Sequence, residues 1–485
     1  MWLQPVQSPV ARRLTRVYHR LTVAGREVPR FGPVLLVANH PNSLIDPAVV
    51  AGVACRPVRF LAKHTLFHGE FVSWIVRGAG SIPVYRQVDA AGLMYQNQDA
   101  FEAVFEALAT GSAVGIFPEG LSHSESQLAP LKTGAARIAL GAAERLGASF
   151  PIIPIGLTFE RRDAFRSHGL VVIGNPVAWG DLSGAGTGDV EATHELTNRI
   201  DSALRLVTVN LDRWEDAPMV HMAEAVFAVE SSADPRPHAR IRRLKEITDR
   251  LSELRSRGSG EWETLIRELT RHDRILRKLR MRPADLRRRP GIAAVARWTG
   301  RTIPLLGLLG IAVVAIGSAL FWPPYKLVGM VVARVRPLRD VRSTYKLVVG
   351  IVLFTLWWAL LTGAAWGWQG WIAAAAVALG LPLLGILTLE LQERWASAID
   401  DAHRFVVHRT RPRAIAQLAE RQKALAASLH QLYYSRPIPE AVHLKPGSDE
   451  HPSSPSVSSS FGFQPAETRS EGEAVESGPA LDAAE

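Results

Sequence analysis

Cysteine is nearly missing from this sequence, in which Cys55 is the only one among 485 residues. A lone cysteine excludes an internal disulfide framework and any metal site built from several thiolates, and it agrees with a reducing cytoplasm. The sequence also lacks the Gly-x-Ser-x-Gly pattern that presents a nucleophilic serine at a strand-to-helix turn. Because Cys55 lies in an apolar helical stretch and the nearby Arg56 points to another face of that helix, we expect no activated thiolate. These absences argue against a covalent enzyme intermediate.

A secretory signal is also absent, since the first residues lack the continuous apolar core that such a signal needs. Basic residues instead alternate with Leu14, Val17 and Leu21. The basic residues are Arg12, Arg13, Arg16 and Arg20. We interpret residues 1–29 as a basic amphipathic segment. Its helix either lies on anionic lipid or forms an ordinary surface helix of the next domain, and the pattern fits both.

Charged residues are missing from Leu347–Leu389, whereas the first two-thirds of the chain mixes charged and apolar residues as a soluble protein does. The segment is long enough for two membrane-spanning helices of about 20 residues each. An uncharged stretch, Gly363–Gly370, divides it and carries Trp366 and Trp368, and such aromatic residues are typical of a membrane interface. The sequence therefore predicts a transmembrane helical hairpin over residues 347–389.

A second apolar segment, residues 302–333, contains Pro323-Pro324 and has basic residues on both sides. After it, Arg334–Lys346 carries five basic residues and one acidic residue. Short loops rich in Arg and Lys stay in the cytoplasm. Because both flanks prefer the same side, we expect a re-entrant or interfacial segment that bends at the two prolines.

Residues 216–301 lack strand signals and contain periodic helical stretches that end in a strongly basic block. Between Arg271 and Arg301 there are eleven Lys and Arg residues against two acidic residues. The whole chain has a formal net charge of +10, which would suit nucleic acid, but its basic residues crowd beside the apolar segments. We therefore predict a phospholipid surface as the partner of this basic helical region, and no nucleic acid.

The last part of the chain, from residue 390 onward, has the composition that we expect of segments on the cytoplasmic side. Residues 390–440 contain several arginines and an amphipathic pattern that predicts a cytoplasmic helix, whereas residues 445–485 have too few apolar side chains to build a core. We expect that tail to be disordered. Together these segments predict an integral membrane protein whose bulk lies on the cytoplasmic face of the cell membrane.

Residues 30–215 show the pattern of an α/β domain. Short β-branched strands alternate with alanine-rich helical stretches, and a final amphipathic helix covers about residues 190–211. The predicted strands are Val34–Val37, Val114–Phe117, Ile152–Leu157 and Leu170–Ile173. We expect a mixed sheet covered by helices, followed by a helical, membrane-embedded C-terminal region.

Polar residues follow the first of these strands directly, in the stretch Asn39-His40-Pro41-Asn42-Ser43-Leu44-Ile45-Asp46-Pro47. Asp46 before Pro47 makes a good helix start, so His40 is placed on a strand-to-helix loop at the edge of the sheet. There a neutral imidazole can take a hydroxyl proton while Asp46 holds its other nitrogen. A capping aspartate beside an unrelated loop histidine would give the same spacing.

Two further stretches supply groups that suit a phosphate. Gly80–Arg86 ends in Arg86, whose guanidinium can form a two-pronged contact, and Lys132 precedes a helix whose first amides can also hold an anion. A surface ion pair at Arg86 and a solvated Lys132 are the ordinary alternatives. A phosphate beside a hydroxyl describes a glycerol phosphate.

These stretches together resemble the glycerolipid acyltransferase superfamily, which includes glycerol-3-phosphate and lysophosphatidate acyltransferases. The resemblance covers roughly residues 30–176. The four family blocks occur in order as Asn39-His40 through Asp46, Gly80 through Arg86, Phe117-Pro118-Glu119-Gly120 with Ser122, and Ile152-Ile153-Pro154-Ile155-Gly156.

The resemblance implies roles for individual residues. His40 would be the general base and Asp46 the residue that orients it. Acceptor binding would fall on Arg86, Glu119 and Gly120. With Ser122 of the third block and Lys132, which we chose from its place before a helix, these are the predicted substrate-binding residues. The common family spacing has four residues between the histidine and the aspartate, whereas this chain has five. That longer form, with Pro-Leu-Lys-Thr-Gly, resembles the subgroup that acylates glycerol 3-phosphate or dihydroxyacetone phosphate.

The resulting hypothesis is direct transfer of a fatty acyl group from acyl-CoA or acyl carrier protein to the hydroxyl of glycerol 3-phosphate, without a cofactor or a bound metal. A 1-acylglycerol-3-phosphate or other lysophospholipid acyltransferase is the alternative. A hydrolase with His40, Asp46, Glu119 and His123 as metal ligands is permitted by the residue types. A non-enzymatic lipid-binding protein is the third class, and the intact His40–Asp46 pair argues against it.

Overall fold

The computed structural model describes residues 1–68, 70–85, 97–122, 127–209, 216–258, 260–287, 298–300, 307–338 and 341–434. These residues belong to one compact unit, Met1–Ser435. Arg86, His123 and the predicted disordered tail lie outside the described residues.

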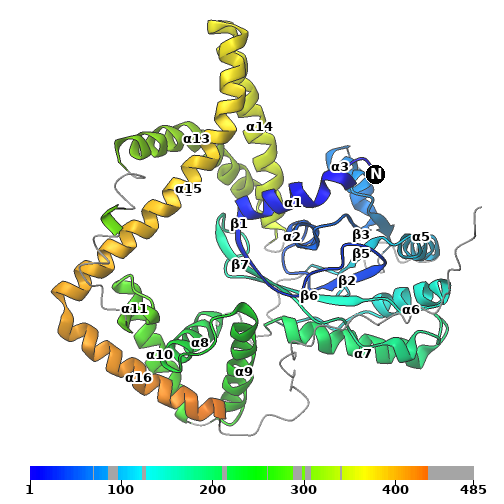
Figure 1. Ribbon diagram of the computed structural model, residues 1–485, viewed down its shortest axis with the longest axis horizontal. Coiled ribbons are helices and arrows are strands. Elements are labelled where there is room, and N and C mark those ends of the chain that lie inside the picture. The colour runs from blue at the N-terminus through cyan, green and yellow to red at the C-terminus, as the bar shows by residue number, and fades with distance from the viewer. Residues whose placement is uncertain are drawn as a thin grey trace, which may run out of the picture. The chain divides into compact units, whose positions relative to one another are not determined.

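A seven-stranded mixed sheet forms the centre of the N-terminal domain (Figure 1). Its strands are β1 (His19–Gly25), β2 (Val34–Ala38), β3 (Val58–Lys63), β4 (Ile82–Val84), β5 (Ala113–Ile116), β6 (Ile152–Phe159) and β7 (Ser167–Ile173). They lie in the order β1-β7-β6-β2-β5-β3-β4. Only the β6–β7 pair is antiparallel. The predicted mixed sheet is confirmed, and the structure adds β1, β3 and β4 to the strands expected from sequence.

Helices cover both faces of this sheet. They are α1 (Gln4–Tyr18), α2 (Ile45–Ala54), α3 (Glu70–Gly78), α5 (Asn97–Ala109), α6 (Gly134–Leu146) and α7 (Val190–Val207), with short 3₁₀ turns η1 (His64–Phe67) and η3 (Gly180–Leu182). Every residue of β2 is buried, as expected for a central parallel strand.

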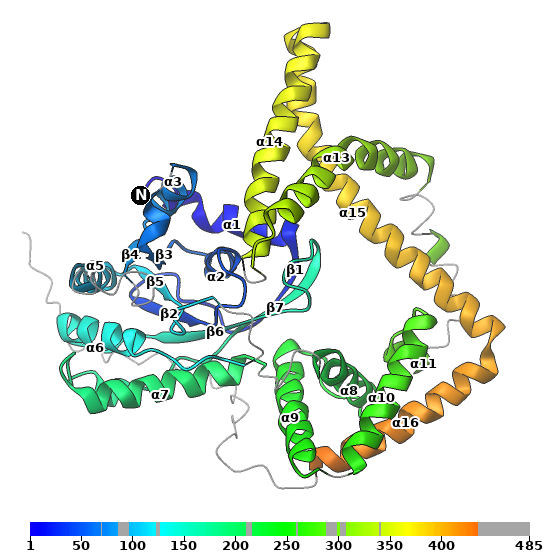
Figure 2. The ribbon, with the colours of Figure 1, turned by 180° about the vertical axis from the view of Figure 1, so that it is seen from behind.

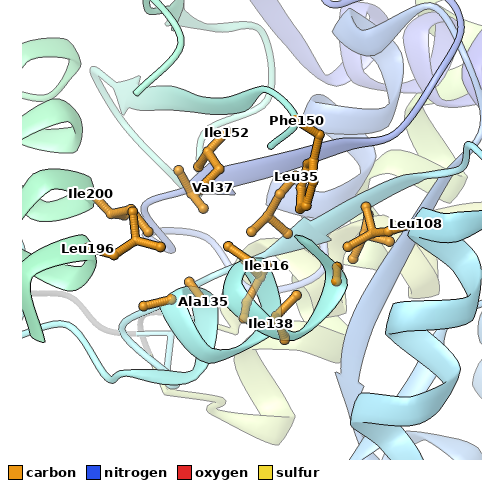
Figure 3. Packing of buried hydrophobic residues seen from close by; sticks show 14 of the residues in the cluster. Leu35, Val37, Leu108, Ile116, Ala135, Ile138, Phe150, Ile152, Leu196 and Ile200 are labelled. Atoms are coloured by element: carbon orange, nitrogen blue, oxygen red, sulfur yellow. The ribbon is translucent and has the colours of Figure 1, made fainter. Parts of the chain in front are cut away.

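Alternate residues of β2 belong to different cores. Leu35 and Val37 pack with α5, α6 and α7, and Figure 3 shows Leu196 and Ile200 of α7 near Val37. Leu36 belongs to the core on the other face, with α1 and α2. Each such fully buried side chain contributes roughly 1.5–3 kcal/mol, so β2 fixes the point from which the next loop leaves the sheet.

A separate helical group follows this domain. It contains α8 (Ala217–Glu230), α9 (Pro237–Ser256), α10 (Gly260–Lys278), α11 (Pro283–Arg287) and, from much later in the chain, α16 (Pro412–Tyr434). Two apolar clusters join α16 to the earlier helices. The predicted basic helical region and the predicted cytoplasmic helix therefore pack together.

Within the described ranges, three helices are long and apolar enough to cross a membrane, namely α13 (Leu308–Val335), α14 (Arg342–Gln369) and α15 (Trp371–Thr410). α14 and α15 meet at Gly370, whose φ of 81° suits glycine. We expected the whole Gly363–Gly370 stretch to form the turn, but α14 stays helical through Gln369 and the turn is confined to Gly370.

The first apolar segment differs from the expectation. We expected the chain to fold back at Pro323-Pro324, but α13 continues through both prolines as one helix. The expected fold-back at these prolines is wrong, because proline removes one backbone hydrogen bond and kinks a helix without always ending it. The interfacial alternative for this segment stays a prediction. The ribbon of α13 changes direction partway along (Figures 1 and 2).

Candidate active site

Several polar loops leave the sheet at one edge. Strands β2, β3, β5 and β6 run parallel, so their carboxyl ends share the edge where ligands bind in open α/β sheets. The loop from β2 to α2 carries His40, and the loop after β5 carries Glu119. The structure therefore brings the first and third blocks of the sequence together.

His40 and Asp46 form a pair. The Nδ1 atom of His40 lies 2.9 Å from Oδ2 of Asp46. The same Oδ2 accepts the backbone N–H of Asn42 at 2.6 Å. The Asp46 side chain is fully buried, whereas 18% of the His40 side chain is exposed. With Nδ1 committed to Asp46, Nε2 is the ring nitrogen left to meet a substrate.

Burial raises the pKa of the Asp46 carboxyl, while hydrogen bonds from His40 and the Asn42 amide and the charge of Arg162 act in the opposite direction. Its second oxygen, Oδ1, is buried, and no group among the described residues donates a hydrogen bond to it. A carboxylate in so apolar a place interacts strongly with an adjacent imidazolium. The pair is thus suited to hold a proton that His40 takes up.

The His40 ring has a second restraint. It stacks on the ring of Phe117, with 4.1 Å between centroids and 14° between planes. Phe117 directly follows β5 and belongs to the third block of the sequence. Stacking on one face and the Asp46 contact at one edge together fix the direction in which Nε2 points.

Glu119 forms hydrogen bonds with the loop that carries His40. Its Oε1 accepts the backbone N–H of His40 at 2.7 Å, and its Oε2 accepts the backbone N–H of Ala129 at 2.9 Å. The side chain is only 4% exposed. Glu119 therefore positions the His40 loop, while the acceptor-binding role that the resemblance implied stays a prediction.

Two other side chains fix the same loop. The hydroxyl of Ser122 accepts the backbone N–H of Ser43 at 3.1 Å. Asn39 makes two hydrogen bonds to the backbone of Leu157 in β6, of 3.0 and 2.7 Å. Sequence reasoning quoted Asn39 without giving it a role, and its position directly before His40 was the available signal.

Lys132 and Gly120 lie against each other. A Cβ atom added to Gly120 would come within 3.0 Å of Cδ and Cε of Lys132, and Gly120 has a φ of 77°. The left-handed φ of Gly120 favours glycine in this turn, and the absence of a side chain leaves room for the lysine. Lys132 itself is exposed, and its backbone N–H donates to Pro118 at 2.8 Å. The structure brings Lys132 to the Glu119 loop, as a phosphate site there would need.

Sequence reasoning missed a second polar strand end. Strand β3 ends in Lys63, and His64 begins the next turn at the same edge of the sheet. The His64 ring stacks on Tyr85 with 4.6 Å between centroids. β3 is only partly buried, whereas β2 is buried throughout, so the sequence signal that found the polar end of β2 is weaker at Lys63 and His64.

Residues 20–158 match the family model described as Acyltransferase. This part of the chain is similar to proteins of the acyltransferase family. The resemblance predicted from sequence is thus confirmed, and His40, Asp46 and Glu119 all lie inside the matched residues.

Curated relatives of the acyltransferase domain are known in yeast. Glycerol-3-phosphate O-acyltransferase 2 of Saccharomyces cerevisiae is 33% identical over 134 residues, and glycerol-3-phosphate O-acyltransferase 1 is 32% identical over 137 residues. Each match covers 27% of this chain and 18% of the relative. The aligned part thus spans less than a fifth of the length of these proteins.

A solved structure is also similar to this chain. It is the 1-acyl-sn-glycerophosphate acyltransferase PlsC from Thermotoga maritima, with 18% sequence identity over 42% of this chain and 80% of that chain. The TM-score is 0.31, and at that value the likeness carries no argument.

A metal site was the basis of the hydrolase alternative. Among the residues that the structure describes, no group of three or more His, Cys, Asp and Glu side chains could hold a metal ion. Glu119 directs both oxygens to backbone amides, and Asp46 directs one oxygen to His40. His123, the fourth residue of that hypothesis, is outside the described residues.

Proposed function

We propose that this chain is a membrane-bound O-acyltransferase that transfers a fatty acyl group from acyl-CoA or acyl carrier protein to a hydroxyl of glycerol 3-phosphate. The observation that carries the proposal is the His40–Asp46 pair, 2.9 Å apart at the carboxyl edge of the sheet, inside the residues that match the Acyltransferase family model. The names of the yeast relatives support glycerol 3-phosphate as the acceptor.

In the proposed mechanism, Nε2 of His40 removes the proton of the acceptor hydroxyl as its oxygen attacks the thioester carbonyl. Asp46 stabilises the imidazolium that forms. The tetrahedral intermediate then collapses, the carbon–sulfur bond breaks, and the imidazolium returns its proton to the leaving thiolate. The products are an ester and a free thiol, and the reaction needs no cofactor.

Transfer is direct in this proposal, without an acyl-enzyme intermediate. Cys55 is exposed and ends helix α2, whereas Asp46 is in the first turn of the same helix. The helix has 10 residues, so its two ends are about 15 Å apart at a rise of about 1.5 Å per residue. Cys55 is therefore too far from the pair to act as its nucleophile.

The acceptor phosphate would bind beside the Glu119 loop. Lys132 lies over Gly120 there, and helix α6 begins two residues later with amides that favour an anion. Arg86 would complete the phosphate site. The phosphate site is proposed from the sequence patterns around Arg86 and Lys132 and from the position of Lys132 beside Gly120.

Membrane attachment is supported by α13, α14 and α15, which are long and apolar enough to span a bilayer. Helix α1 adds an exposed apolar stripe at helical spacing. The stripe consists of Val6, Val10, Leu14 and Val17, and the exposed Trp2 lies just before the helix. Its exposed neighbours include Arg13 and Arg16, a combination that suits the interface with anionic lipid. We place the acyltransferase domain on the cytoplasmic face.

The proposal is tested with the full chain reconstituted in lipid nanodiscs. Labelled glycerol 3-phosphate, dihydroxyacetone phosphate and lysophosphatidate are supplied in parallel with acyl-CoA and acyl carrier protein, and the products are identified. We expect acylated glycerol 3-phosphate and equal release of thiol, with no loss of activity in a chelator. Thiol release without an acylated acceptor would instead indicate a hydrolase.

A further inference from the structure

The first turn of helix α14 contacts the loop that carries His40. The backbone N–H of Leu44 donates to Oγ1 of Thr344 at 3.2 Å. The adjacent Ser343 donates its hydroxyl to the carbonyl of Arg162 at 2.9 Å. These residues begin a helix that is long and apolar enough to cross a membrane, so a candidate membrane span reaches into the surroundings of the active site.

The segment from Asn42 to Asp46 depends on such outside partners. The amides of Ile45 and Asp46 donate to the carbonyls of Asn42 and Ser43 within the segment. The amide of Asn42 uses Asp46 itself, and the remaining two use hydroxyls from elsewhere. Those hydroxyls are on Ser122 and Thr344.

Local backbone geometry makes the outside partners important. Ser43 has a φ of 47°, a left-handed conformation that is unfavourable for a residue with a side chain. Leu44 is the N-cap of α2, and the first amides of a helix have no partner within that helix. Without Thr344 the Leu44 amide would lose its acceptor, two residues before Asp46.

Ion pairs hold the first turn of α14 in this position. Lys346 lies 3.2 Å and Arg342 lies 3.6 Å from the carboxylate of Asp163. The neighbouring Arg162 donates to the carbonyl of Pro41 at 3.2 Å and accepts from the Asn42 side chain at 3.2 Å. The turn is thus attached to the His40 loop both directly and through residues 162–163.

We propose that Thr344 is a positioning residue for the His40–Asp46 pair, so that docking of the first turn of α14 completes the active site. This inference rests on the proposed acyltransferase function. The five residues between His40 and Asp46 explain why this loop needs a hydrogen-bond partner from another part of the chain. That segment includes a strained Ser43, and the hydroxyl of Thr344 holds the amide that follows it.

The test compares Thr344→Val with Thr344→Ser in the full chain in nanodiscs. Valine keeps the shape but removes the acceptor, so kcat should fall about 3- to 10-fold with both KM values unchanged, as for one lost hydrogen bond. Serine should restore the rate. Thr362→Val is the matched control, because Thr362 lies in the same helix and its Oγ1 forms no hydrogen bond in the described part of the chain.

Two readouts separate positioning from a general loss of stability. In a His40→Ala background, Thr344→Val should cause no further loss of rate. Amide hydrogen exchange should become faster in the peptide that covers residues 42–46 of the Thr344→Val variant alone. Equal kcat in Thr344→Val and Thr362→Val, or unchanged exchange in that peptide, would overturn the inference.

The same experiment keeps the two hypotheses apart. Turnover by the unmodified chain tests the proposed function first. If the unmodified chain transfers no acyl group to any acceptor, the proposed function fails, while hydrogen exchange still reports whether Thr344 orders the loop.

Discussion

The carboxylate of Glu119 accepts a hydrogen bond from the backbone N–H of His40, with 2.7 Å between the two atoms. Its other oxygen binds the amide of Ala129. The Glu119 side chain is buried, and its carboxylate links the loop that contains His40 to the segment that contains Ala129. It acts on the His40 loop through the backbone, and that contact predicts a particular kinetic effect.

We expect Glu119→Gln to lower kcat more than it raises the KM of the acceptor. Glutamine keeps one acceptor oxygen but turns an NH₂ group toward the other backbone N–H. One hydrogen bond in a buried place is lost, which costs about 1–3 kcal/mol of unfolding free energy. Steady-state kinetics and thermal unfolding check this, with Glu106→Gln on an exposed site of α5 as the control. A large rise in acceptor KM with normal kcat and stability would contradict the positioning role and support acceptor binding by Glu119.

His40→Ala should lower the rate of acyl transfer by about 10²–10⁴-fold, the usual effect of removing a general base. Folding should remain intact, because the ring makes one aromatic contact and one polar contact and is partly exposed. The measurement is single-turnover acyl transfer alongside a thermal unfolding curve. His168→Ala replaces an exposed histidine of β7 and serves as the control. Transfer at a near-normal rate by folded His40→Ala protein would remove His40 from the mechanism.

The acid sensitivity of folding should depend on His19. Burial lowers the pKa of this histidine to about 4. The unfolded chain binds the proton near the ordinary value of about 6.5, so folding stability is complete above pH 6.5 and is lost as the pH falls toward 4. The loss is at most about 3 kcal/mol, at about 1.36 kcal/mol per pKa unit.

Thermal unfolding midpoints between pH 7.5 and 4.5 should therefore fall less steeply for His19→Leu than for the unmodified chain. Both proteins are measured in the same detergent, since the hydrophobic segments need it. Equal slopes in this pH range would mean that His19 already carries a proton in the folded protein.

Sequence reasoning found the strands whose own residues form a clear apolar run. β2 is a continuous apolar run, buried on both faces, and such runs identify central parallel strands. β1 and β4 are the two edge strands, and β1 carries exposed residues among buried ones. Edge strands need fewer apolar residues, so their pattern is weaker.

In the candidate site, a contact between residues close in the sequence could likewise be predicted, whereas long-range contacts could not. His40 and Asp46 are six positions apart, and their pairing follows from one short loop. Glu119 and Thr344 bind backbone amides that lie 79 and 300 positions away. Every residue except proline has a backbone N–H, so a contact to an amide leaves no residue pattern to read.

We infer the membrane topology from the contacts that the segments flanking the apolar helices make with the helical group and with the acyltransferase domain. Before α13, the carbonyl of Asp285 accepts a hydrogen bond from His408 at 2.9 Å, in the helical group. After α13, Lys346 pairs with Asp163 of the acyltransferase domain. Further along, Glu393 of α15 pairs with Arg20 of β1 at 3.1 Å. Both flanks of α13 and the end of the α14–α15 hairpin therefore lie on the cytoplasmic side in our proposal.

A single crossing by α13 would contradict these contacts. Its start would then lie on the far side, and residues 288–307 would have to cross as well. That stretch contains Arg288, Arg289, Arg297 and Arg301, which are costly inside a bilayer. The packing of α13 agrees, because its Ser318 accepts a hydrogen bond from Gln392 near the cytoplasmic end of the α15 span. We therefore expect only α14 and α15 to cross, although α13 is long enough to do so.

Single-cysteine labelling in sealed cells tests this arrangement, with Cys55 first replaced by serine. Cysteines are placed at Leu338 after α13, at Trp368 near the turn before α15, and at Ser428 in α16, all three of which are exposed. An impermeant maleimide added from outside should modify only the cysteine at position 368, and all three should react once the cells are opened. Modification at 338 from outside would show that α13 crosses. In that case the contacts of Lys346 and Thr344 with the acyltransferase domain could not coexist with a cytoplasmic active site, and both the topology and the role of Thr344 would be wrong.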